Sequence, residues 1–217
     1  MRYILIPVKH LGHAKERLAP LMSPSERTRL AEAMVESTLE VATQTRLADR
    51  IAMVTLFEPA IMLARRYGVE VILEQEQVSE SRSVDFGIKE LARAGASSVL
   101  RLPIDLPLLE AGDIDSIFEH DRSSPHAVLV PSRDGTGTNA LLRRPGGIFQ
   151  SHFGPQSCVK HLTAAREAGI DCEVVQLPRI ALDIDDIDDI STLLEQGQGT
   201  RIHGVLSEMK IPQRLHR

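Results

Sequence analysis

Short apolar segments alternate with segments of helical periodicity along this 217-residue chain. The apolar segments are predicted strands, at Tyr3–Ile6, Ile51–Thr55, Val69–Leu73, Ser98–Leu102, Ala127–Val130 and Cys172–Leu177. Predicted helices lie between them, one starting after Ser23 and others at Pro59–Tyr67, Val84–Ala94, Ser157–Ala168 and Asp186–Glu195. Strands and helices that alternate in this way form βαβ units and a mostly parallel sheet. The alternation therefore predicts an α/β fold of one domain, with a Rossmann-like sheet flanked by helices.

Capping residues and glycines mark the ends of several predicted helices. Ser23-Pro24-Ser25-Glu26 combines a capping box with proline at the first helical position, which indicates a helix start. Gly68 and Gly95 follow two other predicted helices, at a position where glycine commonly ends a helix. Asp113 is the predicted N-cap of a further short helix. These signals also locate the loops that follow the predicted strands.

The last part of the chain differs in charge from the rest. From Thr200 onward, one acid, Glu208, stands against four cations, namely Arg201, Lys210, Arg214 and Arg217. We therefore divide the chain into a main domain at residues 1–199 and a loosely packed C-terminal extension at residues 200–217.

The overall composition excludes several classes of protein. The formal net charge is −5, so no basic field covers the molecule and we expect no nucleic-acid partner. Cys158 and Cys172 have no C-x-x-C spacing, which argues against a disulfide framework and a zinc site. The apolar run Tyr3–Pro7 is too short for a signal sequence, and no segment approaches the length of a membrane span. We expect a cytoplasmic protein without a membrane partner, either as a monomer or as a homodimer.

Ligands of such a sheet bind beyond the carboxyl ends of its strands, so the residues just after each predicted strand are the candidates for function. The first of these loops, PVKHLGHAKERLAP, carries Lys9, Lys15 and Arg17. These cations could neutralise the phosphates of a nucleotide, although the P-loop pattern is absent. A solvated basic loop is the alternative.

Two acidic segments follow later strands. Asp105 lies between two prolines in PIDLPLL, where a carboxylate is well placed to hold a Mg²⁺ that bridges phosphates. Asp183 and Asp185 in LDIDDIDDI fall on the same side of an extended segment, because side chains there alternate with period two. Carboxylate oxygens suit Mg²⁺ rather than zinc. Helix or turn capping is the alternative for each of these acids.

Polar residues and glycines gather in two further segments. The stretch VPSRDGTGTNALL separates two apolar runs by a long loop in which Thr136, Thr138 and Asn139 offer polar groups and Gly137 allows close approach of a ligand. In FGPQSCVKH, Gly154 and Ser157 lie at the start of a predicted helix, where free N–H groups bind anions. The two segments look like halves of one small anion pocket. An ordinary capped helix is the alternative for the second segment.

Six segments resemble, in order, the successive motifs of the CofC/FbiD family: IPVKHLGHAKERLAP, SPSERTRLAEAM, PIDLPLL, VPSRDGTGTNALL, FGPQSCVKH and LDIDDIDDI. The resemblance runs from about residue 3 to residue 195. Members of this family are guanylyltransferases of coenzyme F(420) biosynthesis with a MobA-like nucleotidyltransferase fold, of the nucleotide-diphospho-sugar transferase type. The resemblance implies that GTP and a small phosphorylated carboxylic acid give a guanylyl diphosphate ester and pyrophosphate. The acid would be 2-phospho-L-lactate, phosphoenolpyruvate or 3-phospho-D-glycerate.

The resemblance also implies roles for residues of this chain. Lys15 and Arg17 would meet the GTP phosphates in the catalytic centre. Asp105, Asp183 and Asp185 would hold Mg²⁺. Thr138, Gly154 and Ser157 would bind the phosphate and the carboxylate of the acid.

The chain departs from the family pattern at one place. Most members carry GLN-x-A where this chain has Ser81-Arg82-Ser83-Val84-Asp85. This segment lies near the nucleotide in related folds, so base specificity and acceptor preference stay open. Arg82 would supply an extra anion contact, and a surface arginine before a helix is the alternative.

The implied chemistry requires no general base. The acceptor's phosphate oxygen is already ionised at neutral pH, because the second pKa of a phosphate lies near 6. Mg²⁺ and cations would reduce the repulsion between the two anions and stabilise the leaving pyrophosphate. One alternative is a related MobA-like enzyme that uses another nucleotide or a sugar or alcohol phosphate. The other is a nucleotide-binding regulator without turnover, for which a full metal set would be unnecessary.

Overall fold

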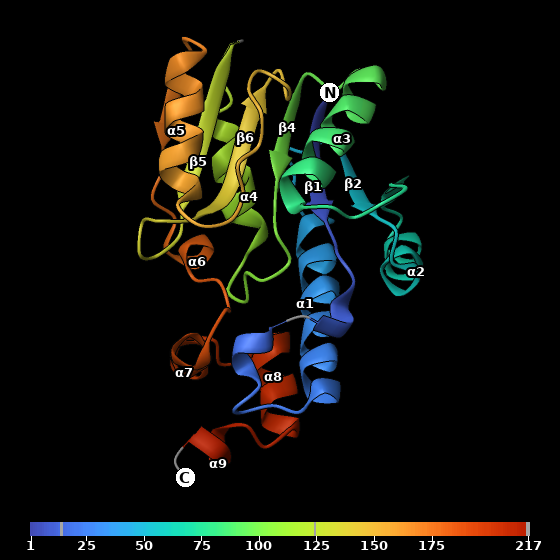
Figure 1. The fold of residues 1–217 in the computed structure, drawn as a ribbon, viewed down its shortest axis with the longest axis vertical. Helices are drawn as coiled ribbons and strands as arrows, with labels where there is room; N and C mark the ends of the chain where they lie inside the picture. Colours follow the sequence, from blue (N-terminus) through green and yellow to red (C-terminus); the bar gives the residue numbers. More distant parts are fainter. Residues whose placement is uncertain (14, 124, 216–217) are drawn as a thin grey trace.

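Seven strands form a single sheet with the order β3-β2-β1-β4-β6-β5-β7 in this computed structural model, which describes residues 1–13, 15–123 and 125–215 (Figure 1). The strands are β1 (Arg2–Pro7), β2 (Arg50–Thr55), β3 (Glu70–Leu73), β4 (Ser98–Arg101), β5 (His126–Pro131), β6 (Thr138–Arg144) and β7 (Cys172–Val174). Neighbouring strands are parallel except where β6 pairs antiparallel with β4 and with β5. The prediction of a mostly parallel α/β sheet is confirmed.

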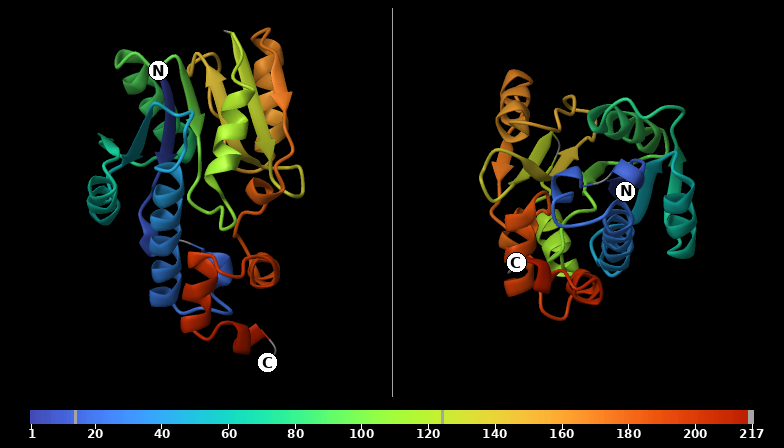
Figure 2. Two further views of the ribbon diagram at one scale, coloured as in Figure 1. Left: turned by 180° about the vertical axis from the view of Figure 1, so that it is seen from behind. Right: turned by 60° about the horizontal axis from the view of Figure 1, so that its bottom comes forward.

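Helices cover both faces of the sheet (Figures 1 and 2). One face packs against α3 (Glu80–Arg93) and α5 (Ser157–Glu167), and the other packs against α1 (Pro24–Ala42), α2 (Glu58–Arg66) and α4 (Ala111–Glu119). Side chains of β1 alternate between the faces: Tyr3 and Leu5 join the core under α3, whereas Ile4 and Ile6 join the core under α1. Four helices follow β7, namely α6 (Pro178–Ala181), α7 (Ile187–Gln196), α8 (Arg201–Glu208) and α9 (Pro212–Leu215).

Most predicted element boundaries are correct to within a residue or two, with three exceptions. The predicted strand Cys172–Leu177 ends at Val174, three residues early. The capping box at Ser23 is present, since the Ser23 hydroxyl accepts from the Glu26 N–H and the Glu26 carboxylate accepts from the Ser23 N–H. Helix α3 begins at Glu80, four residues before the predicted start at Val84, because Ser79 caps it. The predicted N-cap role of Asp113 is wrong: Glu110 is the N-cap of α4, and Asp113 reaches back to the Glu110 N–H.

The C-terminal segment is packed into the main core, which corrects the prediction of a loosely packed extension. Helix α8 lies beside α1, and its residues Ile202 and Leu206 are fully buried in the same apolar cluster as Leu30 and Met34 (Figure 1). Arg201 pairs with Glu36 and Glu40 of α1, and its charge is thereby compensated at the surface. None of the helices in the described part of the chain is long and apolar enough for a membrane span.

Candidate active site

A cleft of about 640 Å³ lies beyond the carboxyl ends of β1 and β4. Its walls come from the loop after β1, the start of α3 and the loop after β4, and they include Pro7, Lys9, His10, Leu11, Lys15, Glu16, Arg17, Glu80, Arg101, Pro103, Ile104, Asp105 and Asp185. Five predicted site residues are therefore brought together here, namely Lys9, Lys15, Arg17, Asp105 and Asp185. This is where a doubly wound sheet places its ligands.

Lys15 lies at the centre of the charges in this cleft. Its ammonium Nζ is 2.7 Å from Asp105 Oδ2 and 3.2 Å from Asp185 Oδ1. Burial disfavours its charge, but the two carboxylates outweigh burial and raise the pKa of Lys15. Lys15 is thus a cation at neutral pH, and it connects the loop after β1 with two separate acidic segments.

The segment before α7 follows the predicted alternation. Leu182 and Ile184 are buried in the core, and Asp183 and Asp185 therefore lie on the opposite side. The Ile184 N–H donates to the carbonyl of Asp105 at 3.0 Å, which holds this segment beside the loop after β4. The three predicted carboxylates consequently belong to one region of the structure.

Asp183 is the least compensated of these carboxylates. Burial, followed by the nearby charges of Asp105 and Asp185, raises its pKa to about 6. The pKa of Asp105 is shifted the other way: burial raises it, but the positive charge of Lys15 outweighs burial and lowers it. Asn139 Nδ2 donates to Asp183 Oδ1 at 3.1 Å. Asp183 therefore offers negative charge that no cation of the described chain neutralises by a direct ion pair.

The donor set fits magnesium when the substrate is counted as part of the site. In the part of the chain that the structure describes, no three carboxylate, histidine or cysteine side chains form a ready-made metal cluster. Mg²⁺, however, is usually bound by one or two carboxylates together with substrate phosphates and waters. Asp105 and Asp183 meet that requirement by number. Asp105 and Asp185 both pair with Lys15, at 2.7 and 3.2 Å, and Asp183 makes no direct ion pair among the described residues. The predicted magnesium ligands stay a prediction.

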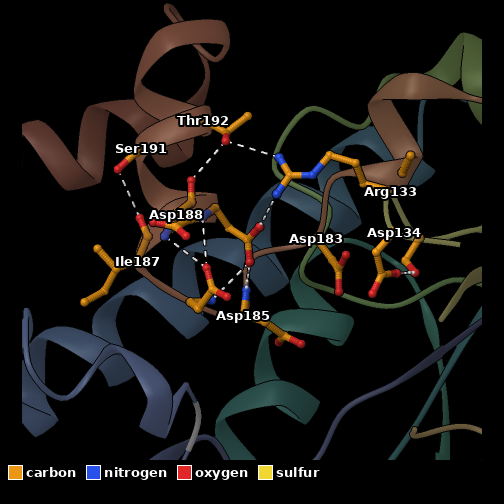
Figure 3. A network of polar contacts seen from close by, with 12 residues as sticks. Arg133, Asp134, Asp183, Asp185, Ile187, Asp188, Ser191 and Thr192 are labelled. Atoms are coloured by element: carbon orange, nitrogen blue, oxygen red, sulfur yellow. Dashed lines mark hydrogen bonds and ion pairs between the residues drawn. The ribbon is translucent and has the colours of Figure 1, made fainter. Parts of the chain in front are cut away.

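The loop between β5 and β6 is ordered by its own hydrogen bonds. Asp134 accepts from the N–H and the hydroxyl of Thr136 at 2.9 and 2.7 Å, and Ser132 Oγ accepts from the Gly137 N–H at 2.7 Å. Arg133 anchors the loop to α7 through Asp189 at 2.9 Å and Thr192 at 3.2 Å (Figure 3). The N–H and hydroxyl of Thr136 and the N–H of Gly137 are therefore engaged within the loop, and the predicted contacts of these two residues to a ligand stay a prediction.

The two predicted halves of the anion pocket do lie together. The Cys158 N–H at the start of α5 donates to the Thr136 carbonyl at 3.1 Å, and the hydroxyl of buried Thr138 lies 3.0 Å from Nδ1 of His161. Ser157 is the first residue of α5, and Gly154 turns the chain into it with φ of +110°, which favours glycine. The start of α5 thus packs against the loop before β6 and against Thr138 at its first position.

Two buried arginines on the α3 and α5 side of the sheet were not predicted as site residues. Arg101 donates to the carbonyls of Thr138 and Asn139 at 3.2 and 3.3 Å and pairs with Glu80. Arg143 is fully buried and donates to the Phe149 carbonyl at 2.6 Å. A charged residue inside an apolar strand run, as in VLRL and LLRR, is the sequence signal that could have identified both.

The segment that departs from the family pattern contacts the loop that leads into α5. Ser81 Oγ accepts from the Phe153 N–H at 2.8 Å, and Asp85 accepts from the N–H and hydroxyl of Ser151 at 3.1 and 2.7 Å. Arg82 is exposed on α3 and is not among the residues that line the cleft. Its predicted anion contact stays a prediction.

Sequence comparison identifies the family. A family model described as "Guanylyl transferase CofC like" matches residues 1–216. The chain belongs to this family. The resemblance seen in its motifs is therefore confirmed, and so is its assignment as an enzyme of nucleotidyl transfer.

Three relatives align with this chain over nearly the whole length of both proteins. The phosphoenolpyruvate guanylyltransferase of Conexibacter woesei is 32% identical, over 95% of this chain and 96% of the relative. The 3-phospho-D-glycerate guanylyltransferase of Phenylobacterium zucineum is 34% identical, over 91% of each chain. The 2-phospho-L-lactate guanylyltransferase of Methanothermobacter thermautotrophicus is 29% identical, over 95% of this chain and 90% of the relative.

Solved structures confirm the predicted fold type. A presumed nucleotide-diphospho-sugar transferase from Desulfovibrio desulfuricans G20 superposes with a TM-score of 0.79 at 14% identity, covering 98% of this chain and 97% of the other. A nucleotidyl transferase from Methanothermobacter gives a TM-score of 0.63 at 17% identity, covering 90% and 97%. At these identities, both similarities show that the fold is shared.

Proposed function

We propose that this protein transfers GMP from GTP to the phosphate of a small phosphorylated carboxylic acid and releases pyrophosphate, as a step of coenzyme F(420) biosynthesis. The observation that carries the proposal is the pair of adjacent residues Thr138 and Asn139. Asn139 bonds Asp183 on the acidic side of the site, and Thr138 lies against α5 on the anion-binding side. The two reactants would therefore meet at the start of β6.

The protein's contribution to this chemistry is charge and orientation. Lys9, Lys15 and Arg17 would contact the triphosphate from the loop after β1. The α5 N-terminus, with Gly154 and Ser157, would hold the acid, because the helix dipole favours an anion there and the Ser157 hydroxyl can donate to it. The acid's phosphate oxygen attacks the α-phosphorus, and the bond to the β-phosphate oxygen breaks with loss of pyrophosphate. No residue has to remove a proton, because this oxygen is already ionised.

Magnesium would be held by Asp105 and Asp183 together with the phosphates. When bound, it would neutralise negative charge on the triphosphate and on the leaving group. The raised pKa of Asp183 supports this assignment, since a bound cation would favour its ionised form. A nucleotide and an acid of this type are cytoplasmic metabolites, and we propose that location for the enzyme.

The test is a substrate matrix with product detection by mass. GTP, CTP and ATP are each incubated with 2-phospho-L-lactate, phosphoenolpyruvate and 3-phospho-D-glycerate in the presence of Mg²⁺, and pyrophosphate release is measured in parallel. We expect a guanylyl diphosphate ester with at least one acid and with GTP in preference to the other nucleotides. Absence of product in every combination would overturn the proposal.

Asp105→Asn provides a matched variant for the same assay. Loss of this preorganised charge should lower turnover by roughly 10²–10³-fold, as removal of a comparable electrostatic group does. Asp188→Asn is the control, because it is the same substitution at an exposed position of α7. Turnover of Asp105→Asn within a few-fold of the control at saturating Mg²⁺ would remove Asp105 from the catalytic centre.

A further inference from the structure

We propose that His161 is a positioning residue that makes the Thr138 hydroxyl a hydrogen-bond donor toward an anionic oxygen of the acceptor acid. The inference rests on the proposed function in one respect, the location of Thr138 in the acceptor pocket. It goes beyond that function by assigning a direction to a hydrogen bond. It also assigns a role to a residue that sequence reasoning did not select.

The surroundings of His161 fix its tautomer. His161 is fully buried on α5, and its Nε2 lies 2.8 Å from the backbone nitrogen of His152. A backbone N–H can only donate, so Nε2 must be the unprotonated, accepting nitrogen. A neutral imidazole carries one proton, and that proton is therefore on Nδ1.

The tautomer in turn fixes Thr138. Nδ1 of His161 is 3.0 Å from Thr138 Oγ1, and with the proton on Nδ1 the threonine oxygen is the acceptor. The hydroxyl proton of Thr138 is then available for a second bond, and the structure provides no acceptor for it within residues 1–13, 15–123 and 125–215. An ionised phosphate or carboxylate accepts hydrogen bonds without donating any, so it is the kind of group this hydroxyl would bind.

A second proton on His161 is opposed from several sides. Burial, followed by the charges of Arg143 and Arg101, lowers its pKa to about 3. A proton on Nε2 would also face the His152 N–H. Phe153 packs against the ring at a centroid distance of 4.8 Å in an edge-on arrangement. The ring is therefore held in one orientation and one charge state through the neutral pH range.

His161 and Ser157 share one face of α5, because residues four apart on a helix lie one above the other. The first turn of α5 would thus place the Ser157 hydroxyl near the acceptor, while His161, one turn later, orients the hydroxyl of Thr138. The rival explanation is that the bond between His161 and Thr138 only stabilises the packing of α5 on β6.

A direct measurement of the tautomer tests the first step without any variant. In ¹⁵N-histidine-labelled wild-type protein at pH 7, we expect one imidazole with a protonated Nδ1 and an unprotonated Nε2, and this signal should be absent from His161→Asn. An imidazolium or an Nε2-protonated ring at this position would overturn the proposal. The result does not depend on activity, so it stands even if guanylyl transfer is not found.

A double-mutant cycle tests the second step, with KM for the acid and KM for GTP measured separately. A hydroxyl bound to a charged group contributes enough that Thr138→Val should raise KM for the acid by roughly 10–100-fold. His161→Leu should raise it by about 3–10-fold, and His161→Asn should recover part of this loss, because its amide can still donate. Coupled residues are not additive, so the double variant should match Thr138→Val within about twofold.

The remaining outcomes distinguish a failure of the role proposed for His161 from a failure of the proposed function. His203→Leu on α8 is the control and should behave as wild type. Multiplicative effects in the double variant, or an unchanged KM for the acid in folded His161→Leu, would show that His161 is only structural. If Thr138→Val also leaves this KM unchanged while wild-type turnover is intact, the acceptor pocket is misplaced. Absence of turnover in wild type would instead refute the proposed function.

Discussion

The negative charge of Asp183 is disfavoured by its surroundings in the folded protein. Its pKa is raised to about 6, through burial first and then through Asp105 and Asp185. A raised carboxyl pKa means that the residue supports the fold best in its protonated form, at low pH. This support is lost as the pH rises through about 6, so at neutral pH the ionised side chain destabilises the protein. Such a residue is expected where a cationic ligand compensates the charge.

Asp183→Asn should therefore make the protein more stable and less active. Without Mg²⁺ at pH 7.5, the free energy of unfolding should increase, on the order of 1–2 kcal/mol, because the uncompensated charge is removed. The bond from Asn139 can persist, since the amide oxygen still accepts. Turnover with GTP should fall by roughly 100-fold or more. Thermal unfolding and steady-state kinetics, with Asp188→Asn as control, decide the matter. A less stable variant with normal turnover would contradict the interpretation.

His161 should make stability depend on pH in the acidic range. Its pKa is about 3 in the folded protein and 6.5 when unperturbed. Between these values the unfolded chain binds one more proton than the folded chain, so stability falls as the pH is lowered. The fall should reach up to about 1.4 kcal/mol for each pH unit. Urea unfolding at pH 7, 6 and 5 measures this slope, and His161→Asn should have a shallower one. Equal slopes in both proteins would exclude the buried neutral imidazole.

At the scale of elements, α3 supports the loop that leads to α5. Ser81 and Asp85 accept hydrogen bonds from Phe153 and Ser151 of that loop. Asp85 also lies 3.9 Å from fully buried Arg143, which has no closer carboxylate partner among the described residues. The departure from the family pattern at these positions therefore concerns how α3 packs against the loop before α5, which belongs to the proposed acceptor side.

Asp85→Ala should weaken both this packing and the use of the acid. Loss of the carboxylate leaves the buried Arg143 with less compensation, and because Asp85 is partly exposed we expect about 1–3 kcal/mol of destabilisation, below the range for a fully buried pair. KM for the acid should rise while KM for GTP changes little. Asp85→Asn keeps an acceptor for Ser151 and should be milder in both respects. A larger effect on GTP than on the acid would place this segment on the nucleotide side instead.

Periodicity predicted the elements better than it predicted their contacts. Strand and helix positions follow from local patterns, and the motif residues at strand ends, such as Lys15 and Asp105, do share one cleft. A charge within an apolar strand run could single out Arg101, but the partners of Arg101 and His161 are distant in the sequence, so a local pattern does not show what either residue contacts. Helix α6 has only four residues, about one turn, so its sequence cannot show a repeating helical pattern.

At the scale of the whole molecule, the C-terminal helices contact the residues that connect the loop after β1 to α1. Arg214 donates to the Leu21 carbonyl at 3.2 Å and pairs with Glu26, the glutamate of the α1 capping box. Hydrogen bonding to Arg214 is the main reason that the pKa of Glu26 is lowered to about 2. The charge pattern of this segment suggested a loose extension, whereas its apolar residues Ile202 and Leu206 determine how it packs.

Ile202→Ala should therefore behave as a core substitution. Ile202 is fully buried in the cluster that contains α1, and removal of its outer carbons should lower the free energy of unfolding by about 2–4 kcal/mol. Gln213→Ala, at an exposed position in the same segment, should change it by less than about 0.5 kcal/mol. Urea unfolding at pH 7 gives both values. Because the contact is remote from the acceptor pocket's residues in β6 and α5, KM for the acid should stay at the wild-type value in folded Ile202→Ala. A loss below about 1 kcal/mol would mean that α8 contributes little to the core.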